Sequence, residues 1–366
     1  MAYTVRYANF DLTTGNNDGT TEADAWQTLA DLNTGMTGGG FLCHIKKQAA
    51  RQLYTGNPVI MCPNALIGNP SIIRGYGTTI NDGVRWEFGT TSSANLLMGE
   101  YTTWDYVDID ESSGGRTSGD EVGTCIKRSI VRANGDVRFA TFDSCYIELR
   151  NFGFIRGQGT GVTRMYRTYV RRTGNNAVVL AGMDMFGHPL TVMDCIFHGN
   201  GVVGQHGLQV GRHNDSRGCV VANNIFYNCD DGITFPNIES NFVGRFGHIY
   251  GNLFDTMAGY AIAAPTTVVG QNRLMNNYYR NCTSGFTNYG PLSADDPPVV
   301  LSADPFVDAA NNDFTINDTV GGGRVLRDAG FSANLASGAM LNRPFGSFLS
   351  QLGGGGGTPP QRSYWG

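Results

Sequence analysis

Charge is scarce in this sequence of 366 residues. Only 16% of the residues are charged, and the formal net charge is −5. A chain with an acidic balance is a poor match for nucleic acid, so we expect no nucleic-acid partner. Apolar runs are also short, and none approaches the length needed to cross a bilayer, so we expect no membrane partner.

Paired cysteine motifs are missing as well. The eight cysteines are spread along the chain without a CxxC pair, which argues against a zinc knuckle or a redox motif. We expect most of them to be buried free thiols at strand or turn positions of a repeat. They are Cys43, Cys62, Cys125, Cys145, Cys195, Cys219, Cys229 and Cys282.

The N-terminal segment MAYTVRYANF lacks the basic and apolar regions of an ordinary secretion signal. We therefore expect the protein to be made in a host cytoplasm. The expected location is a virion, and the alternative is an extracellular or cell-surface position.

Glycine is abundant, with 51 residues, and the stretch from Pro189 to Gly290 repeats one short pattern four times. An aromatic residue recurs at steps of 29, 28 and 25 residues, at Phe197, Phe226, Phe254 and Tyr279. A polar residue precedes each aromatic, at Asp194, Asn224, Asn252 and Asn277. A glycine and an apolar or aromatic residue follow, at Gly207-Leu208, Gly232-Ile233, Gly259-Tyr260 and Gly285-Phe286. Such a repeat indicates one supersecondary unit stacked on copies of itself.

The period selects the type of solenoid. Each repeat holds apolar runs of three to five residues separated by Asn or Gly, with no helical stretch and no LxxLxL pattern. Asn and Gly tolerate the positive φ that sharp bends require. We predict an all-β protein, a right-handed parallel β-helix of about ten coils with N- and C-terminal caps. The predicted boundaries are 1–40 for the N-terminal cap, 41–300 for the β-helix, 301–350 for the C-terminal cap and 351–366 for a linker and tail.

Two end motifs add a family resemblance. The opening GNNDGT and AWQTL, followed by IIRGYGTTINDG, resembles the N-terminal region of the pectate-lyase-like family of right-handed β-helix proteins. The later ADPFVDAANNDFTIN and GGGRVLRDAG resemble the closing element of that family. The resemblance implies the fold, whereas the fold carries lyases, hydrolases, epimerases and inert phage spikes alike.

Arginine is concentrated in the middle of the chain. Between Lys127 and Arg172 the acids are only Asp136, Asp143 and Glu148. One interpretation is a stripe that binds an anionic polysaccharide or an acidic partner. The other is a solvated face whose arginines pair with acids elsewhere on the rod. The arginines are Arg128, Arg132, Arg138, Arg150, Arg156, Arg164, Arg167, Arg171 and Arg172.

Glycoside hydrolysis needs two carboxylates that face one groove. The candidate residues are Asp230 and Asp231, with Asp194, His198 or Asp255 on adjacent coils. Neighbouring residues of a strand point to opposite faces, so we expect at most one of Asp230 and Asp231 to face a groove. The alternative is that Asp-Asp-Gly serves only to form a turn.

A lyase would need clustered carboxylates for Ca²⁺ and a basic residue. Asp108, Asp110 and Glu111 are the candidates, with Arg128 or Arg132 one coil away, but the Arg-x-Pro-x-x-Arg motif of the family's lyases is missing. We expect the six histidines to lie on the polar surface, and we predict no metal and no cofactor.

The chain closes with QLGGGGGTPPQRSYWG, a flexible and then stiff linker followed by an arginine and two aromatics. We interpret Arg362, Tyr364 and Trp365 as a docking tail that binds other virion proteins. The predicted function is a structural virion component, a spike, fibre or decoration protein that forms a homo-oligomer, with a trimer favoured, and has surface glycan as a candidate ligand. The alternative is a polysaccharide lyase or glycoside hydrolase of the tailspike type.

Overall fold

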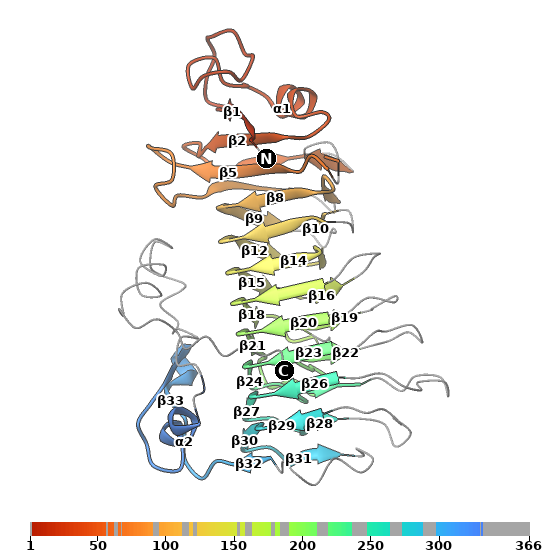
Figure 1. Ribbon diagram of the computed structural model, residues 1–366, viewed down its shortest axis with the longest axis vertical. Helices are drawn as coiled ribbons and strands as arrows, with labels where there is room; N and C mark the ends of the chain where they lie inside the picture. Colours follow the sequence, from red (N-terminus) through yellow and green to blue (C-terminus); the bar gives the residue numbers. More distant parts are fainter. Residues whose placement is uncertain are drawn as a thin grey trace, which may run out of the picture.

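The protein is a rod of stacked coils built from three long parallel sheets (Figure 1). The computed structural model describes residues 2–55, 58–61, 65–66, 68–90, 95–111, 117–119, 123–151, 154–157, 163–176, 180–183, 190–210, 219–235, 247–263, 273–287, 298–329 and 331. Successive strands pass from one sheet to the next, and each strand pairs in parallel with its counterpart one coil later. The prediction of a parallel β-helix is confirmed.

Each sheet takes one strand from every coil, in chain order. Sheet A contains β1 (Thr4–Ala8), β2 (Phe41–Lys46), β5 (Ser71–Tyr76), β8 (Thr102–Asp105), β11 (Cys125–Lys127), β14 (Thr141–Asp143), β17 (Thr163–Tyr166), β20 (Leu190–Met193), β23 (Cys219–Ala222), β26 (Gly247–Tyr250) and β29 (Arg273–Met275). Sheet B contains β3 (Gln52–Tyr54), β6 (Trp86–Thr90), β9 (Val107–Glu111), β12 (Ile130–Ala133), β15 (Tyr146–Leu149), β18 (Tyr169–Arg172), β21 (Ile196–His198), β24 (Ile225–Tyr227), β27 (Leu253–Asp255), β30 (Tyr278–Arg280) and β32 (Val299–Val300). Sheet C contains β4 (Val59–Met61), β7 (Leu96–Met98), β10 (Thr117–Gly119), β13 (Asp136–Arg138), β16 (Phe154–Gly157), β19 (Ala181–Met183), β22 (Leu208–Val210), β25 (Ile233–Thr234), β28 (Tyr260–Ala263) and β31 (Ser284–Thr287).

The N-terminal segment contributes both a strand and a helix. β1 pairs with β2, so sheet A begins at Thr4 and not at residue 41, where the β-helix was expected to start. The helix α1 (Leu29–Gly35) is capped by the Thr28 side chain, and it buries Leu32. Among the described residues, no helix is long and apolar enough to cross a membrane.

The repeated aromatics form a stack inside the rod. Phe197, Phe226 and Phe254 pair in register on β21, β24 and β27, with ring centroids 4.9 and 5.0 Å apart and nearly parallel planes. The repeat glycines lie against these rings. A Cβ on Gly207 would be 2.6 Å from Cδ1 of Phe226, so the stack leaves room only for glycine at that position.

The turn from sheet A to sheet B carries a second, polar column. Asn224, Asn252 and Asn277 are buried, and the side-chain oxygen of each accepts a hydrogen bond from the backbone N–H one coil earlier, at 2.9 to 3.1 Å. The aligned repeats had suggested that Asp194 belongs to this column, but it does not. Asp194 has φ 56° and takes the left-handed backbone position that Asn223 takes one coil later. The residue in line with the buried column is therefore Cys195, whose backbone N–H donates to Oδ1 of Asn224.

The described cysteines are free thiols. Cys43, Cys145, Cys195, Cys219 and Cys229 are buried, as expected, and Cys125 and Cys282 are partly buried. Burial raises the pKa of the Cys145 and Cys229 thiols to about 12, so they remain protonated and unreactive near neutral pH.

Past the last coil, the chain turns back onto the outside of sheet B. We call β33 (Phe306–Asp308), the 3₁₀ helix η1 (Ala309–Asn311), β34 (Asp313–Ile316) and α2 (Gly323–Asp328) the C-terminal module. It lies beside the later coils in Figure 1. A cap across the end of the rod was expected for 301–350, and the described part of that segment instead covers the outward residues of sheet B. The reason is that these residues are apolar along five successive coils, namely Tyr169, Ile196, Ile225, Leu253 and Tyr278.

Candidate functional site

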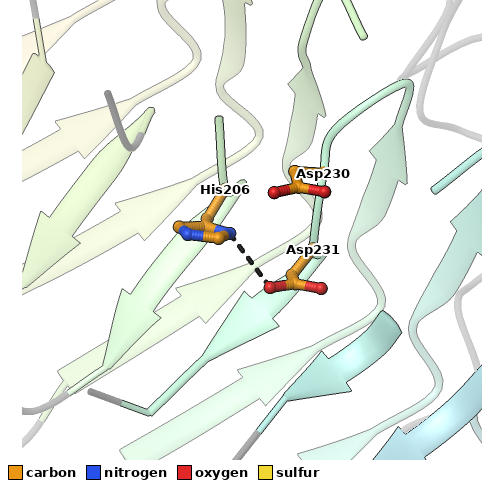
Figure 2. A group of neighbouring side chains, drawn as sticks. All are labelled: His206, Asp230 and Asp231. Carbon is orange, nitrogen blue, oxygen red and sulfur yellow. Dashed lines mark ion pairs between the residues drawn. The ribbon is translucent and has the colours of Figure 1, made fainter. Parts of the chain in front are cut away.

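Two turns between sheets B and C bring together His206, Asp230 and Asp231, which we call the His206 cluster (Figure 2). Asp230 and Asp231 lie between β24 and β25. His206 lies just before β22, one coil earlier. Backbone pairing between Gly207 and Asp231 holds the two coils in register at this point.

The three side chains are close and partly open to solvent. Nδ1 of His206 lies 3.1 Å from Oδ2 of Asp231, and one ligand atom from each residue lies within 4.8 Å of the others. The side chain of His206 is 26% exposed and that of Asp231 is 14% exposed. The cluster can therefore meet a ligand from solvent while its carboxylates are partly shielded from water.

Backbone donors orient the two carboxylates. The N–H of Gly204 donates to Oδ2 of Asp230 at 2.6 Å, and the N–H of Tyr260 donates to Oδ1 of Asp231 at 2.7 Å. Gly259 is needed beside Asp231, because a Cβ there would lie 2.3 Å from Oδ1. Each carboxylate therefore has one oxygen held by a neighbouring coil.

Strand alternation does not separate the two aspartates. We expected at most one of them to face a groove, but both belong to a turn in which the chain is not extended, and both reach the cluster. The alternative that Asp-Asp-Gly serves to form a turn also holds in part, because both carboxylates accept backbone hydrogen bonds.

One feature of the repeat relates His206 to Asp231 in the sequence itself. His206 and Asp231 each precede the repeat glycine, at Gly207 and Gly232, so they occupy one position on successive coils. Strands of adjacent coils lie about 4.8 Å apart, which brings such residues into contact.

Asp194 lies elsewhere, in the turn between sheets A and B. Burial raises the pKa of Asp194, and a hydrogen bond from Asn223 opposes that shift. Asp255 and His198, the other candidate partners, point outward from sheet B under the C-terminal module. Asp255 binds Arg280, and His198 contacts Tyr169. The structure therefore brings together Asp230 and Asp231 and leaves the other three residues out.

The described arginines are spread over all three sheets, and most of them are paired. Arg164 is exposed on sheet A, Arg171 is half-buried on sheet B beside Tyr146, and the side chain of Arg156 lies outside the described residues. Arg172 is buried and donates to the carbonyl of Asn151 at 2.7 Å, and burial lowers its pKa to about 10. The ion pairs are Arg128 with Asp105, Arg132 with Asp108 and Glu148, Arg138 with Asp136, Arg150 with Asp110 and Glu148, and Arg167 with Asp143.

The carboxylates considered for a lyase are committed to contacts within the rod. Asp108 pairs with Arg51 and Arg132, and Asp110 pairs with Arg150. Glu111 is fully buried and accepts the backbone N–H groups of Asn134 and Gly135.

Two further predicted features have no structural counterpart to report. The docking tail, with Arg362, Tyr364 and Trp365, lies outside the described residues, as do His188 and His213.

The donor set of the His206 cluster suits two kinds of chemistry. One imidazole nitrogen and two carboxylate oxygens can bind a divalent cation of the Zn²⁺ or Mn²⁺ type. Two carboxylates this close can also act as an acid and a base on one bond.

Comparison with solved structures shows that the fold is similar to that of a parallel β-helix enzyme. The pectate lyase Pel9A superposes with a TM-score of 0.54 at 11% identity, over 85% of this chain and 85% of that protein. ORF18 of Geobacillus virus E2 gives 0.46 at 14% identity, over 80% of this chain and 60% of that one. The A-module of the mannuronan C-5 epimerase AlgE6 of Azotobacter vinelandii gives 0.42 at 12% identity, over 81% of this chain and all of that module. No protein-family model and no curated protein sequence matches the chain.

Proposed function

We propose that this protein cleaves a polysaccharide at the His206 cluster. The observation that carries the proposal is that two carboxylates and an imidazole from successive coils meet at one partly exposed point of a parallel β-helix. The fold shared with a pectate lyase supports a carbohydrate substrate, and the site supplies the groups needed to break a glycosidic bond.

The spacing favours hydrolysis with two carboxylates acting on one bond. The ligand atoms of the cluster lie within 4.8 Å of one another, closer to the roughly 5 Å of retaining glycosidases than to the 6.5 Å or more of inverting ones. We assign Asp231 as the nucleophile, because the N–H of Tyr260 holds its Oδ1 at 2.7 Å while its Oδ2 lies beside His206 at 3.1 Å. Asp230 then donates its proton to the leaving oxygen, and it activates water in the second step.

The test is cleavage of a panel of neutral and uronate-containing polysaccharides, followed by the release of reducing ends. Asp230→Asn and Asp231→Asn should each lower the rate about 100-fold or more, because each removes one of the two reacting groups. Asp194→Asn is the matched control, since Asp194 lies in the other turn, and it should keep the wild-type rate.

Two results would contradict the proposal. One is that the wild-type protein releases no reducing ends from any polysaccharide of the panel. The other is that it cleaves a polysaccharide and both cluster variants keep full activity. Reducing ends accompanied by an unsaturated uronate at the new non-reducing ends would assign the site to a lyase reaction instead.

A structural role in a virion is the second candidate function. It is supported by the terminal sequence, in which five glycines and two prolines precede RSYWG, as expected for a linker with an aromatic docking segment. The partners in this case are other virion proteins and further copies of the chain, with anionic polysaccharide as the ligand.

The assembly state tests this second candidate. We expect the full chain to sediment as a trimer in analytical ultracentrifugation, because spikes built on this fold close a symmetric assembly. We expect a chain ending at Ser350 to keep the trimer but to lose its binding to purified phage particles. A monomer for both chains would argue against the virion role.

A further inference from the structure

The C-terminal module is joined to the rod by one aromatic contact surface. Phe314 of β34 is the centre of this surface, and its ring lies edge-on to Tyr169, His198 and Tyr227 at centroid distances of 6.0, 5.5 and 5.3 Å. Those three residues come from three successive coils of sheet B. Phe314 therefore contacts three coils of the rod at once, and Phe306 adds a contact with Tyr227.

His198 lies within this surface and is 8% exposed. Its Nδ1 is 2.8 Å from the hydroxyl of Tyr169, and that hydroxyl is 3.1 Å from Oδ1 of Asn312 in the module. The His198 ring also stacks on Tyr169 with an interplanar angle of 8°. The hydrogen-bond chain from His198 to Asn312 thus links the rod to the module.

The charged groups around His198 do not favour an imidazolium. Burial is the larger cause that lowers the pKa of His198 to about 4, and the positive charge of Arg171 on β18 is the second cause. The other facing groups are Tyr169 on β18, Tyr227 on β24, and Asn312 and Phe314 in the module. The acids Asp255, Asp304 and Asp308 act on Tyr227, and no carboxylate of the described residues forms an ion pair with His198.

We propose that the C-terminal module is an acid-released clip, which leaves the outer face of sheet B when His198 becomes protonated while the stacked coils stay folded. An imidazolium in this surface would lie beside Arg171, enclosed by aromatic rings and without a carboxylate. Release exposes His198 to water, where the charge is solvated. This device is separate from the proposed cleavage site, which lies in the turns between sheets B and C.

The sign of the effect follows from proton binding. Once released, His198 titrates near its ordinary pKa of 6.5, whereas the docked form titrates at about 4. Between these values the released state binds more protons, so acid favours release. Each pH unit in this window raises the opening equilibrium of the module by up to about tenfold, and nothing further is gained below the lower value.

Hydrogen exchange of the full chain, read by mass spectrometry, tests the clip. Between about pH 6.5 and about pH 4.5, amides of 306–328 should lose roughly 40-fold of their protection, after correction for intrinsic exchange rates. Strands β20 and β23 of sheet A should keep theirs. His198→Phe keeps an aromatic ring and cannot take up a proton, so its module should stay protected at both values.

A matched control and a second variant complete the test. His248→Gln changes an exposed histidine of sheet A and should keep the wild-type acid response. His198→Gln serves if the phenylalanine variant does not fold, and its module should likewise lose no protection in acid. The clip is refuted if sheet A loses protection together with the module. It is also refuted if a folded His198 variant opens in acid as the wild type does, since the Arg280–Asp304 pair would then be the sensitive contact.

Discussion

Phe226→Ala should lower the free energy of unfolding by about 3–5 kcal/mol. Phe226 is fully buried, and its ring lies between Phe197 at 4.9 Å and Phe254 at 5.0 Å. The substitution removes the apolar surface of one ring, two stacking contacts and the support that each neighbouring coil gives the next. Urea unfolding followed by circular dichroism measures the change.

Two controls separate the stack from general sensitivity. Phe226→Leu retains most of the volume and should lose less than half as much stability. Val203→Ala removes a side chain that is 74% exposed and should change stability by no more than about 0.5 kcal/mol. A loss for Phe226→Ala as small as that for Val203→Ala would show that the stack does not support the rod.

Gly207 offers a double-mutant check on the same stack. Gly207→Ala should destabilise by about 1–3 kcal/mol, because its new Cβ would lie 2.6 Å from Phe226 and 2.7 Å from the carbonyl oxygen of Gly232. Combined with Phe226→Ala, the first clash disappears and the second remains. The loss in the double variant should therefore be smaller than the sum of the two single losses.

Arg280→Ala should cost about 3–5 kcal/mol at neutral pH, because it leaves a buried carboxylate without its cation. Asp255 is fully buried, and Arg280 binds it with Nε and Nη2, both at 2.9 Å. Arg280 also reaches Asp304 in the linker to the C-terminal module. The same urea titration, performed at several pH values, measures the loss.

The pH dependence and a paired variant identify the cause. Burial raises the pKa of Asp255 and Arg280 opposes that rise, so removing Arg280 leaves only the weaker opposing effect of the Thr256 hydrogen bond. The folded variant then takes up a proton more readily than the unfolded chain, and the stability loss should shrink as the pH falls toward acid values. Asp255→Leu combined with Arg280→Met should restore most of the stability. An equal loss at neutral and acid pH would contradict this account.

The repeat was sufficient to predict the solenoid and the position of its core. Phe197, Phe226, Phe254 and Tyr279 recur at one phase of the pattern and pair in register in the structure. The register of a sheet with one buried face follows from the apolar pattern, because a shift by one residue would turn the aromatics outward. Local sequence carries this information.

Alignment of the same repeat placed Asp194 in the buried polar column, one position away from the residue that occupies it. Aspartate and asparagine both suit the left-handed turn position and the buried column that follows it, so residue type alone does not separate the two. Cys195, a small residue, continues the column in that coil, and only the backbone φ of Asp194 shows which residue turns the chain.

The sequence by itself determined the parallel β-helix, its aromatic stack and the turn that contains Asp230 and Asp231, because these depend on periodicity and on turn chemistry. The tertiary structure alone decided three other features: the closeness of His206 to both aspartates, the pairing of Arg128, Arg132 and Arg167 with acids on adjacent coils, and the position of the C-terminal module on sheet B. Each of these depends on which residues of different coils lie one above another, or on which outer face can bury an apolar element. Spacing along one chain does not specify such contacts until the coils have stacked.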